Sequence, residues 1–571
     1  MDSGVVLLIA ALLLACGLSL AILGLGRRAL DDDPSQPPVR VFGIPSPLLT
    51  LIRYRRLPMV RDRAAWRPPT LAALLSPLIG PPEPAPAIVA AASDDASGMS
   101  VRGLLRDLGR RRGLNGMRAG AMAVCLAITF SIGITFARSI RGQGWELWAW
   151  LIAILVCAAA LLPLGRLPRL GHIPWAWLAV LFATALLLRA TALNHIPPGL
   201  HPDEAGVATF TVLHVYPESG STLYPFRAGF NSQPTLFQYI IRFSLDLAGY
   251  SIAGLRLSSA LAGALAVLAT FAAVSVLDNR RTGLLAAILM ATYHFHIHWS
   301  RLALNNIWDT LWAPLVLGAL AWGWRRDWSG GAVISGLALG LSQYFYAGSK
   351  LVILLLAFTV WRMWRQEPNP RRLVVHMGKL LVMAACVAAP IAMHILLDPG
   401  PYFARWNVSF GWHPETVRAV MGGQLDWWGY AWHQIWHSLG AFTVFPDTTG
   451  FYGPGVPFLF GPAAILFVVG LVWAAYKRIY TPILWIGLTV IFGGILLAAA
   501  PSSSHYVVSI PAICWLVAVP LNGLIEHGRW RLALALLLVV SIADLGFYFL
   551  EYIPGSPPDL DVPIPTPLGP P

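Results

Sequence analysis

The chain has 571 residues, of which 57% are hydrophobic and 12% charged, with 24 Trp residues and a mean hydropathy of +0.64. This polar content is too small to cover a soluble globule of the same size, so we expect a membrane protein. The formal net charge is +13, but most Arg residues lie in short clusters beside apolar runs, which argues against nucleic acid as a partner.

Fourteen apolar stretches are candidates for membrane-spanning helices, because about 20 apolar residues cross the hydrocarbon core of a bilayer. The sequence therefore predicts an all-α polytopic membrane protein with 13 or 14 spans and short amphipathic helices in its outer loops. The candidates lie near residues 4–26, 119–138, 146–164, 174–193, 253–277, 283–299, 307–324, 331–347, 350–364, 374–397, 456–476, 481–500, 505–525 and 532–550.

The first stretch is a retained helix in this interpretation, and not a signal peptide or a lipoprotein leader. Asp2 stands where a basic residue is expected, and Arg27 and Arg28 follow the run instead of preceding it. All five cysteines lie inside apolar runs, so the spacing offers neither a disulfide framework nor a CxxC metal site.

Basic residues assign a side of the membrane to each loop. Alternate loops carry the Arg and Lys clusters, while the segment 194–252 contains only Arg227 and Arg242. The clusters mark the cytoplasmic side, so both termini and the long loops are expected to face outward, at the plasma membrane. The predicted parts are an N-terminal helix (1–26), an Arg/Pro-rich, largely disordered cytoplasmic segment (27–118), two accessory helices (119–173), a core (174–397) with its first outer loop (194–252), a Trp-rich outer loop (398–455), C-terminal helices (456–550) and a Pro-rich outer tail (551–571).

The Trp-rich loop holds six Trp residues between positions 406 and 436. Such a density is typical of an interfacial aromatic belt, and it also suits a surface on which sugar rings stack. The spacing alone leaves both interpretations open.

The first outer loop begins with "NHIPPGLHPDEAGVATF", which places Asp203 beside Glu204. The simplest interpretation is a helix start, with Pro202 at the first position and acidic residues in the first turn. In a helix, adjacent side chains point about 100° apart, so one carboxylate faces a reacting atom while the other orients or caps.

Further motifs continue from this loop, in "NSQPTLFQYIIRF", "YHFHIHWSRLALNNIWDTLWAPLVLGAL" and "GLSQYFYAGSKLVILLL". Their order over residues 174–365 resembles the GT-C class of membrane glycosyltransferases, in particular the protein O-mannosyltransferases and the lipid A aminoarabinose transferases (glycosyltransferase families 39 and 83). The resemblance implies a GT-C-like core, an acidic motif in the first outer loop and a sugar donor carried on a polyprenyl phosphate.

The sequence departs from the family pattern at two positions. Asn306 stands where relatives often have Asp, six residues after Ser300, and Lys350 stands where Arg is commoner. Lysine keeps the positive charge but loses the bidentate fork of arginine. These differences put the acceptor and any metal site in doubt.

By the same resemblance, Asp203 is the expected catalytic base and Glu204 an orienting or secondary carboxylate. One carboxylate suffices because the leaving group is a stabilised phosphate, so inversion at the anomeric carbon is expected. The expected donor-phosphate ligands are Lys350, Arg301 and Arg256, and the expected substrate-lining residues are His201, Tyr344, Tyr346 and Asn306.

Three histidines of the second motif, His294, His296 and His298, raise the question of a metal ion. His294 and His298 are one helical turn apart, but no carboxylate motif accompanies them. We therefore assign no metal ligand and no cofactor, with a divalent metal ion as the alternative.

The leading hypothesis is an inverting glycosyltransferase that moves a sugar from a polyprenyl-phosphate donor to a lipid, glycan or protein acceptor, with membrane lipids as its surroundings. A lipid-linked sugar flippase or solute transporter is a second hypothesis, because Arg189 and Asp309 lie in or near predicted spans. A non-catalytic envelope-assembly subunit on the same scaffold is a third, suggested by Asn306.

Overall fold

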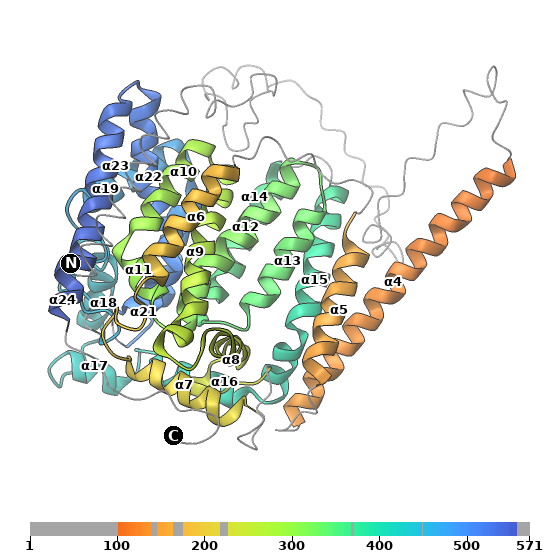
Figure 1. Ribbon diagram of the computed structural model, residues 1–571, viewed down its shortest axis with the longest axis horizontal. Coiled ribbons are helices and arrows are strands. Elements are labelled where there is room, and N and C mark those ends of the chain that lie inside the picture. Colours follow the sequence, from red (N-terminus) through yellow and green to blue (C-terminus); the bar gives the residue numbers. More distant parts are fainter. Residues whose placement is uncertain are drawn as a thin grey trace.

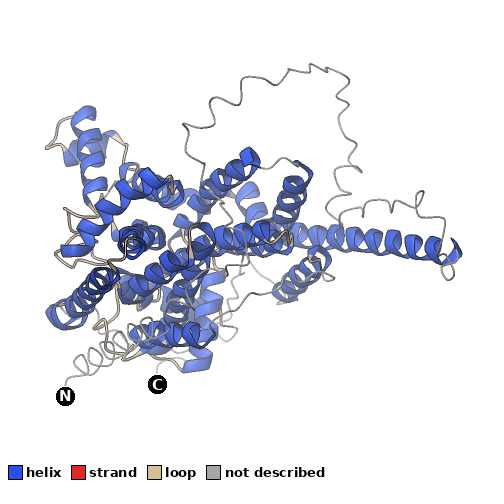
Figure 2. Ribbon diagram, turned by 90° about the horizontal axis from the view of Figure 1, so that it is seen from above, coloured by secondary structure: helices blue, strands red, loops and turns tan. Residues whose placement is uncertain are grey.

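The computed structural model describes residues 101–138, 145–163, 175–216, 226–366, 370–447, 449–498 and 500–556. Within these ranges the chain forms helices and loops without strands, apart from two isolated bridges (Figure 2). Six of the described helices are long and apolar enough to cross a membrane, and shorter apolar helices accompany them. The predicted class, an all-α multi-pass membrane protein, is confirmed. The expected span 4–26 lies outside the described residues, as does the tail from 557 onward.

The other thirteen expected spans each coincide with one helix or with two consecutive helices. These helices are α4 (Val101–Arg138), α5 (Trp145–Leu161), α6 (Trp175–Ala190), α9 (Ile252–Leu277), α10 (Arg280–Thr292), α11 (His294–Ser300), α12 (Asp309–Arg325), α13 (Gly330–Ser342), α14 (Leu351–Gln366), α15 (Pro370–Leu397), α19 (Gly461–Lys477), α20 (Tyr480–Val490), α22 (Ile510–Glu526) and α23 (Trp530–Gly546).

Shorter helices lie in the connections between them. They are α7 (Pro202–His214), η3 (Phe230–Ser232), α8 (Leu236–Ala248), η4 (Asn305–Trp308), η5 (Ala347–Lys350), α16 (Pro399–Ser409), α17 (Pro414–Val420), α18 (Trp427–Gly440), η6 (Ile491–Ile495), α21 (Ser503–Tyr506), η7 (Val507–Ser509), η8 (Phe547–Tyr552) and α24 (Ile553–Gly555).

Two helices differ from the predicted boundaries. Residues 101–118, expected to belong to the irregular cytoplasmic segment, are helical and continue without a break into α4. Apolar residues at positions 101, 104, 105 and 108 follow the helical period there. The expected span 283–299 is divided at Tyr293, whose ψ of 119° is extended and separates α10 from α11.

The helix α9 occupies the centre of the bundle, in contact with α6, α10 and α12 (Figure 1). Small residues allow these close contacts: a Cβ added at Gly318 of α12 would lie 2.9 Å from the Cα of Ala273 in α9. From α12 the packing continues through α13 and α15 to the accessory helices α4 and α5, and from α10 it continues through α22 to α19 and α23. The bundle therefore has two sides joined at α9.

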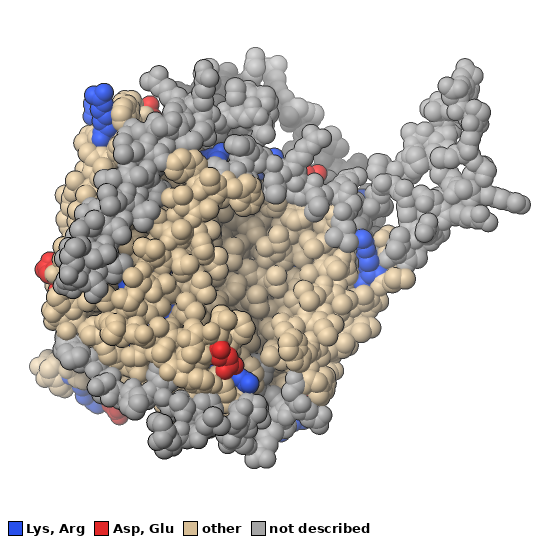
Figure 3. Space-filling view, in the orientation of Figure 1, with Lys and Arg blue, Asp and Glu red and all other residues tan. Residues whose placement is uncertain are grey.

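Several short helices gather at one end of the bundle. Figure 1 shows α7, α8, α16 and α17 together along its lower edge. On the face in Figure 3, the broad surface between the two ends is mostly free of charged side chains and is hollowed near its middle. A surface of this kind is suited to contact the hydrocarbon of a bilayer. The candidate site lies at the end of the bundle that carries the short helices.

Candidate functional site

The helix α7 begins with a capping arrangement that fixes the acidic pair. His201 is the N-cap, its Nδ1 accepts a hydrogen bond from the backbone N–H of Asp203 at 3.1 Å, and Pro202 occupies the first turn. Glu204 accepts in return from the backbone N–H of His201 at 3.2 Å. This reciprocal pattern is a capping box in which histidine takes the place of Ser or Thr. The expected helix start is therefore present.

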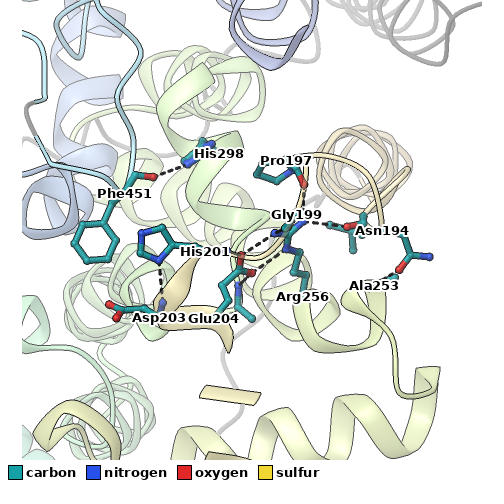
Figure 4. Close-up of polar contacts among 12 residues, drawn as sticks. Asn194, Pro197, Gly199, His201, Asp203, Glu204, Ala253, Arg256, His298 and Phe451 are labelled. Carbon is teal, nitrogen blue, oxygen red and sulfur yellow. Dashed lines mark hydrogen bonds and ion pairs between the residues drawn. The ribbon is translucent and has the colours of Figure 1, made fainter. Parts of the chain in front are cut away.

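Glu204 points into the protein and pairs with Arg256 of α9 (Figure 4). Both side chains are fully buried, and Oε2 lies 2.7 Å from Nη2 while Oε1 lies 2.8 Å from Nε. Oε1 also accepts from the backbone N–H of Ala303 at 2.7 Å. Glu204 thus joins α7, α9 and the loop after α11, which are far apart in the sequence.

Arg256 has no donor left for an external ligand in this arrangement. Besides Glu204, its Nη atoms donate to the backbone carbonyls of Leu193, Pro197 and Gly199 at 3.2, 2.9 and 2.7 Å. These contacts tie the segment after α6 to α9, and the bidentate pair compensates two charges that would be costly to bury singly.

Asp203 points away from that pair, as helix geometry requires of a neighbour (Figure 4). Its carboxylate is half-buried and has one weak contact among the described residues, from Asn231 Nδ2 to Oδ1 at 3.4 Å. It lines a cavity that is open to solvent, with about 420 Å³ of empty space of which part is open solvent. The other lining residues are Val207, Asn231, Gln233, Phe237, Gln238, Leu304, Asn305, Asn306, Tyr346, Arg405, Phe451 and Ser504.

One guanidinium, that of Arg405 in α16, lines the same cavity as Asp203. Tyr346, in the turn between α13 and η5, lies close enough for Arg405 to act on it electrostatically, and its hydroxyl is 2.9 Å from His505 Nδ1. Among the described lining residues, the cavity presents one carboxylate, one guanidinium and one phenol.

The nine residues expected at the site occupy different places. Asp203, Asn306 and Tyr346 line the cavity, and His201 borders it by stacking on Phe451 with ring centroids 4.8 Å apart. Glu204 and Arg256 form the buried pair beside it. The remaining three, Arg301, Tyr344 and Lys350, are absent from the described lining residues.

Arg301 is fully buried and caps the C-terminal end of α6. Its Nη1 donates to the carbonyls of Arg189 and Thr191 at 3.2 and 2.9 Å, and its Nη2 donates to Thr191 at 2.6 Å. A cation is stabilised there by the unpaired carbonyls and by the helix dipole. A donor-phosphate role for Arg301 and Arg256 stays a prediction. All donor groups of Arg256 are bound to protein atoms, whereas the buried Nε of Arg301 has no hydrogen-bond partner among the described residues.

Lys350 and Tyr344 face other parts of the protein. Lys350 is half-buried, and its Nζ has two long contacts, to Gln343 O at 3.3 Å and to Ser349 Oγ at 3.4 Å. Lys350 also interacts electrostatically with the buried carboxylate of Asp309, and its phosphate-binding role stays a prediction. Tyr344 donates to Val387 O at 2.7 Å and packs against Trp150 and Phe226, where the accessory helices meet the core.

The three histidines of the second motif each bind a different partner. His294 Nδ1 lies 2.6 Å from Tyr452 Oη, His296 Nδ1 lies 2.6 Å from Arg189 Nη2, and His298 Nε2 lies 3.0 Å from Phe451 O. Within the described ranges, no three His, Cys, Asp or Glu side chains converge as metal ligands.

The cavity also contains polar residues that sequence reasoning did not select: Asn231, Gln233, Gln238, Asn305, Ser504 and Arg405. The signal available for Arg405 was an isolated basic residue inside an aromatic outer loop, "PYFARWN". The carboxamides at positions 231, 233 and 238 lie within the motif "NSQPTLFQYIIRF", but spacing could not show that they meet Asn305, because this depends on how η3, α8 and η4 pack together.

Comparison with known proteins supplies a family for part of the chain. Residues 232–394 match the family model described as dolichyl-phosphate-mannose-protein mannosyltransferase. No curated protein matches the chain. The matched residues run from η3 to α15, so the resemblance to GT-C membrane glycosyltransferases is confirmed in the part of the chain that carries most of the motifs.

Solved structures with a similar arrangement include ArnT from Cupriavidus metallidurans bound to undecaprenyl phosphate, at 13% identity and a TM-score of 0.42, covering 67% of this chain and 78% of that one. The oligosaccharyltransferase of Archaeoglobus fulgidus in the apo form is similar at 14% identity and a TM-score of 0.42, covering 65% of this chain and 56% of that one.

Proposed function

We propose that this protein is an inverting glycosyltransferase that moves a sugar from a polyprenyl phosphate to a lipid, glycan or protein acceptor. Its active site would face the outer side of the plasma membrane, at the end of the bundle that holds α7, α8, α16 and α17. The observation that carries the proposal is the separation of the acidic pair: Glu204 is neutralised by Arg256, while Asp203 stands in a solvent-open cavity.

In this reaction Asp203 accepts the proton of the acceptor hydroxyl as its oxygen attacks the anomeric carbon. The new C–O bond forms on one face of the sugar, the bond to the phosphate oxygen breaks on the other, and the configuration inverts. The polyprenyl phosphate leaves as an anion whose second pKa is near 6, so no second carboxyl has to protonate it.

Arg405 is the residue best placed to bind the departing phosphate. It lines the cavity with Asp203, and a guanidinium forms charge-assisted, bidentate hydrogen bonds with phosphate oxygens. The Tyr346 hydroxyl, hydrogen-bonded to His505 Nδ1, lines the same cavity. Lys350 remains the predicted second cation, at a turn just beyond Tyr346.

The sequence observations behind the transporter hypothesis gain little from the structure. Arg189 has no free donor group: its nitrogens bind the carbonyls of Ala185, Met290 and Ala291, together with Ser300 Oγ and His296 Nδ1. It caps the C-terminal end of α10 through Met290 and Ala291, as a structural cation does. Asp309, the other residue behind this hypothesis, is fully buried, and its carboxylate oxygens accept no hydrogen bond from the described residues. The described contacts therefore remove the support from Arg189 alone.

The test is the substitution Asp203→Asn, which keeps the shape of the side chain and removes its basicity. Membranes from cells that produce the variant should lose sugar transfer by at least about 10²-fold, in the range contributed by a general base. Transfer is measured as lipid-linked radiolabelled sugar incorporated into envelope material. Glu415→Gln, at an exposed carboxylate of α17, is the matched control and should retain activity. Full activity of Asp203→Asn would refute the proposal.

A further inference from the structure

The charges that line the cavity are few compared with its amide groups. Asp203 is the one carboxylate and Arg405 the one guanidinium among the described lining residues. Five carboxamides accompany them: Asn231, Gln233, Gln238, Asn305 and Asn306. A carboxamide offers both a donor and an acceptor without charge, which matches a hydroxyl group.

Three of these carboxamides line the cavity from the loop before α8, from α8 and from η4. Gln233 and Asn305 are hydrogen-bonded to each other, from Asn305 Nδ2 to Gln233 Oε1 at 3.2 Å. This contact uses one of the two N–H groups of Asn305 and leaves the amide of Gln233 free to donate. Gln238 lies on the neighbouring helix α8 and lines the cavity with them.

Gln238 is the most informative of the three because it is 1% exposed and its Oε1 accepts no hydrogen bond from the described residues. A buried acceptor without a partner destabilises a fold. Residues further along the same face of α8, Ile241 and Leu245, are apolar and fully buried. Leucine at position 238 would therefore suit the packing, which indicates that glutamine serves a ligand there.

We propose that Gln233, Gln238 and Asn305 bind the ring hydroxyls of the transferred sugar and select an uncharged sugar over one with an amino group. This inference rests on the proposed function, in which Asp203 is engaged with the acceptor and Arg405 with the phosphate. The described lining residues then offer no second carboxylate for an ammonium group, and an ammonium held against the buried Gln238 would lose hydration without gaining a counter-charge.

The test uses purified protein in detergent and three water-soluble probes with the same short isoprenyl chain. One is the isoprenyl phosphate without a sugar, and the other two carry a sugar with either a hydroxyl or an amino group at the same ring carbon. Isothermal titration gives the affinities. Wild-type protein should bind the hydroxyl probe at least about tenfold more tightly than the amino probe.

Two variants at Gln238 assign the effect to the carboxamides. Gln238→Leu should weaken binding of the hydroxyl probe by about tenfold and leave binding of the sugar-free probe unchanged. Gln238→Glu supplies a carboxylate and should reverse the preference in favour of the amino probe. The control is Gln424→Leu, at an exposed glutamine outside the lining. If Gln238→Leu does not fold, Gln233→Leu, at a half-buried loop residue, replaces it.

The outcomes separate this inference from the function on which it rests. If the sugar-free probe and both sugar probes fail to bind, the donor chemistry itself is wrong. If all three bind but the hydroxyl and amino probes have equal affinity, or if Gln238→Leu changes nothing, the selection by carboxamides is refuted while the transferase survives.

Discussion

Asp203 and Glu204 are neighbours in the sequence, but their carboxylates have different surroundings. The N-cap at His201 fixes the rotation of α7, and Arg256 then attracts the side chain that faces α9. The other side chain has to face the cavity. The geometry thus supports Glu204 as the orienting carboxylate and Asp203 as the reacting one. Helix geometry alone predicted that only one of the two would face a reacting atom, and the family resemblance selected Asp203.

The first prediction concerns the stability provided by Glu204. Replacing it with Ala leaves the guanidinium of Arg256 buried without a counter-charge and removes the acceptor of the Ala303 N–H. Such a loss costs about 3–5 kcal/mol. We expect Glu204→Ala to unfold well below the wild-type temperature, measured by the tryptophan fluorescence of the solubilised protein.

Asp203→Ala is the matched comparison, since it removes the neighbouring carboxylate of the same helix turn. Asp203 is half-buried with a single long contact, so its loss should change the melting temperature little. Similar melting temperatures for the two alanine variants would show that the Glu204–Arg256 pair does not hold α7 in place.

The arginines show why a site cannot be assigned from charge and position alone. Arg301 follows a family-like Ser, and the same sequence position fits either a phosphate ligand or a helix cap. In the structure it caps α6, because the carbonyls of Arg189 and Thr191 point at its guanidinium. Arg405 carried no motif, yet it reaches the cavity through the fold of the second long loop.

At the scale of elements, the accessory helices are joined to the core by close backbone contact. Gly133 of α4 faces α15, where a Cβ would lie 2.6 Å from Met393 Cβ and 2.9 Å from Pro390 Cα. Nearby, Trp150 of α5 donates to Val387 O of α15 at 2.9 Å. The interface therefore combines a small residue that lets two helices approach with a directional hydrogen bond.

The second prediction follows from this contact. Gly133→Val forces α4 away from α15 and should cost about 1–3 kcal/mol, as overpacking does elsewhere. Gly120→Val is the control on the same helix, since no other atom lies within 4 Å of the added Cβ. A lowered melting temperature for Gly133→Val alone is the expected result. Equal values would place the join between α4 and the core elsewhere.

At the scale of the whole molecule, the sequence predicted helices well and the cavity poorly. Apolar runs specify helices because the membrane forces the backbone to bond within each segment, and each expected span in the described part coincides with helix. The cavity instead brings Asp203 together with Ser504, some 300 residues away. Local spacing carries no information about such a meeting, so only the motif resemblance pointed to Asp203, Asn306 and Tyr346.

The last prediction concerns the side of the membrane on which the cavity opens. Loops that carry basic clusters are expected on the cytoplasmic side, and Arg529, exposed between α22 and α23, lies in one of them. Glu415 of α17 lies at the opposite end, among the short helices of the cavity end.

In a variant without the five native cysteines, Glu415→Cys should react with a membrane-impermeant maleimide on intact cells. Arg529→Cys should react only after the membrane is permeabilised. The reverse pattern would put Asp203 on the cytoplasmic side, away from any acceptor outside the cell, and the proposed reaction would then have no substrate within reach.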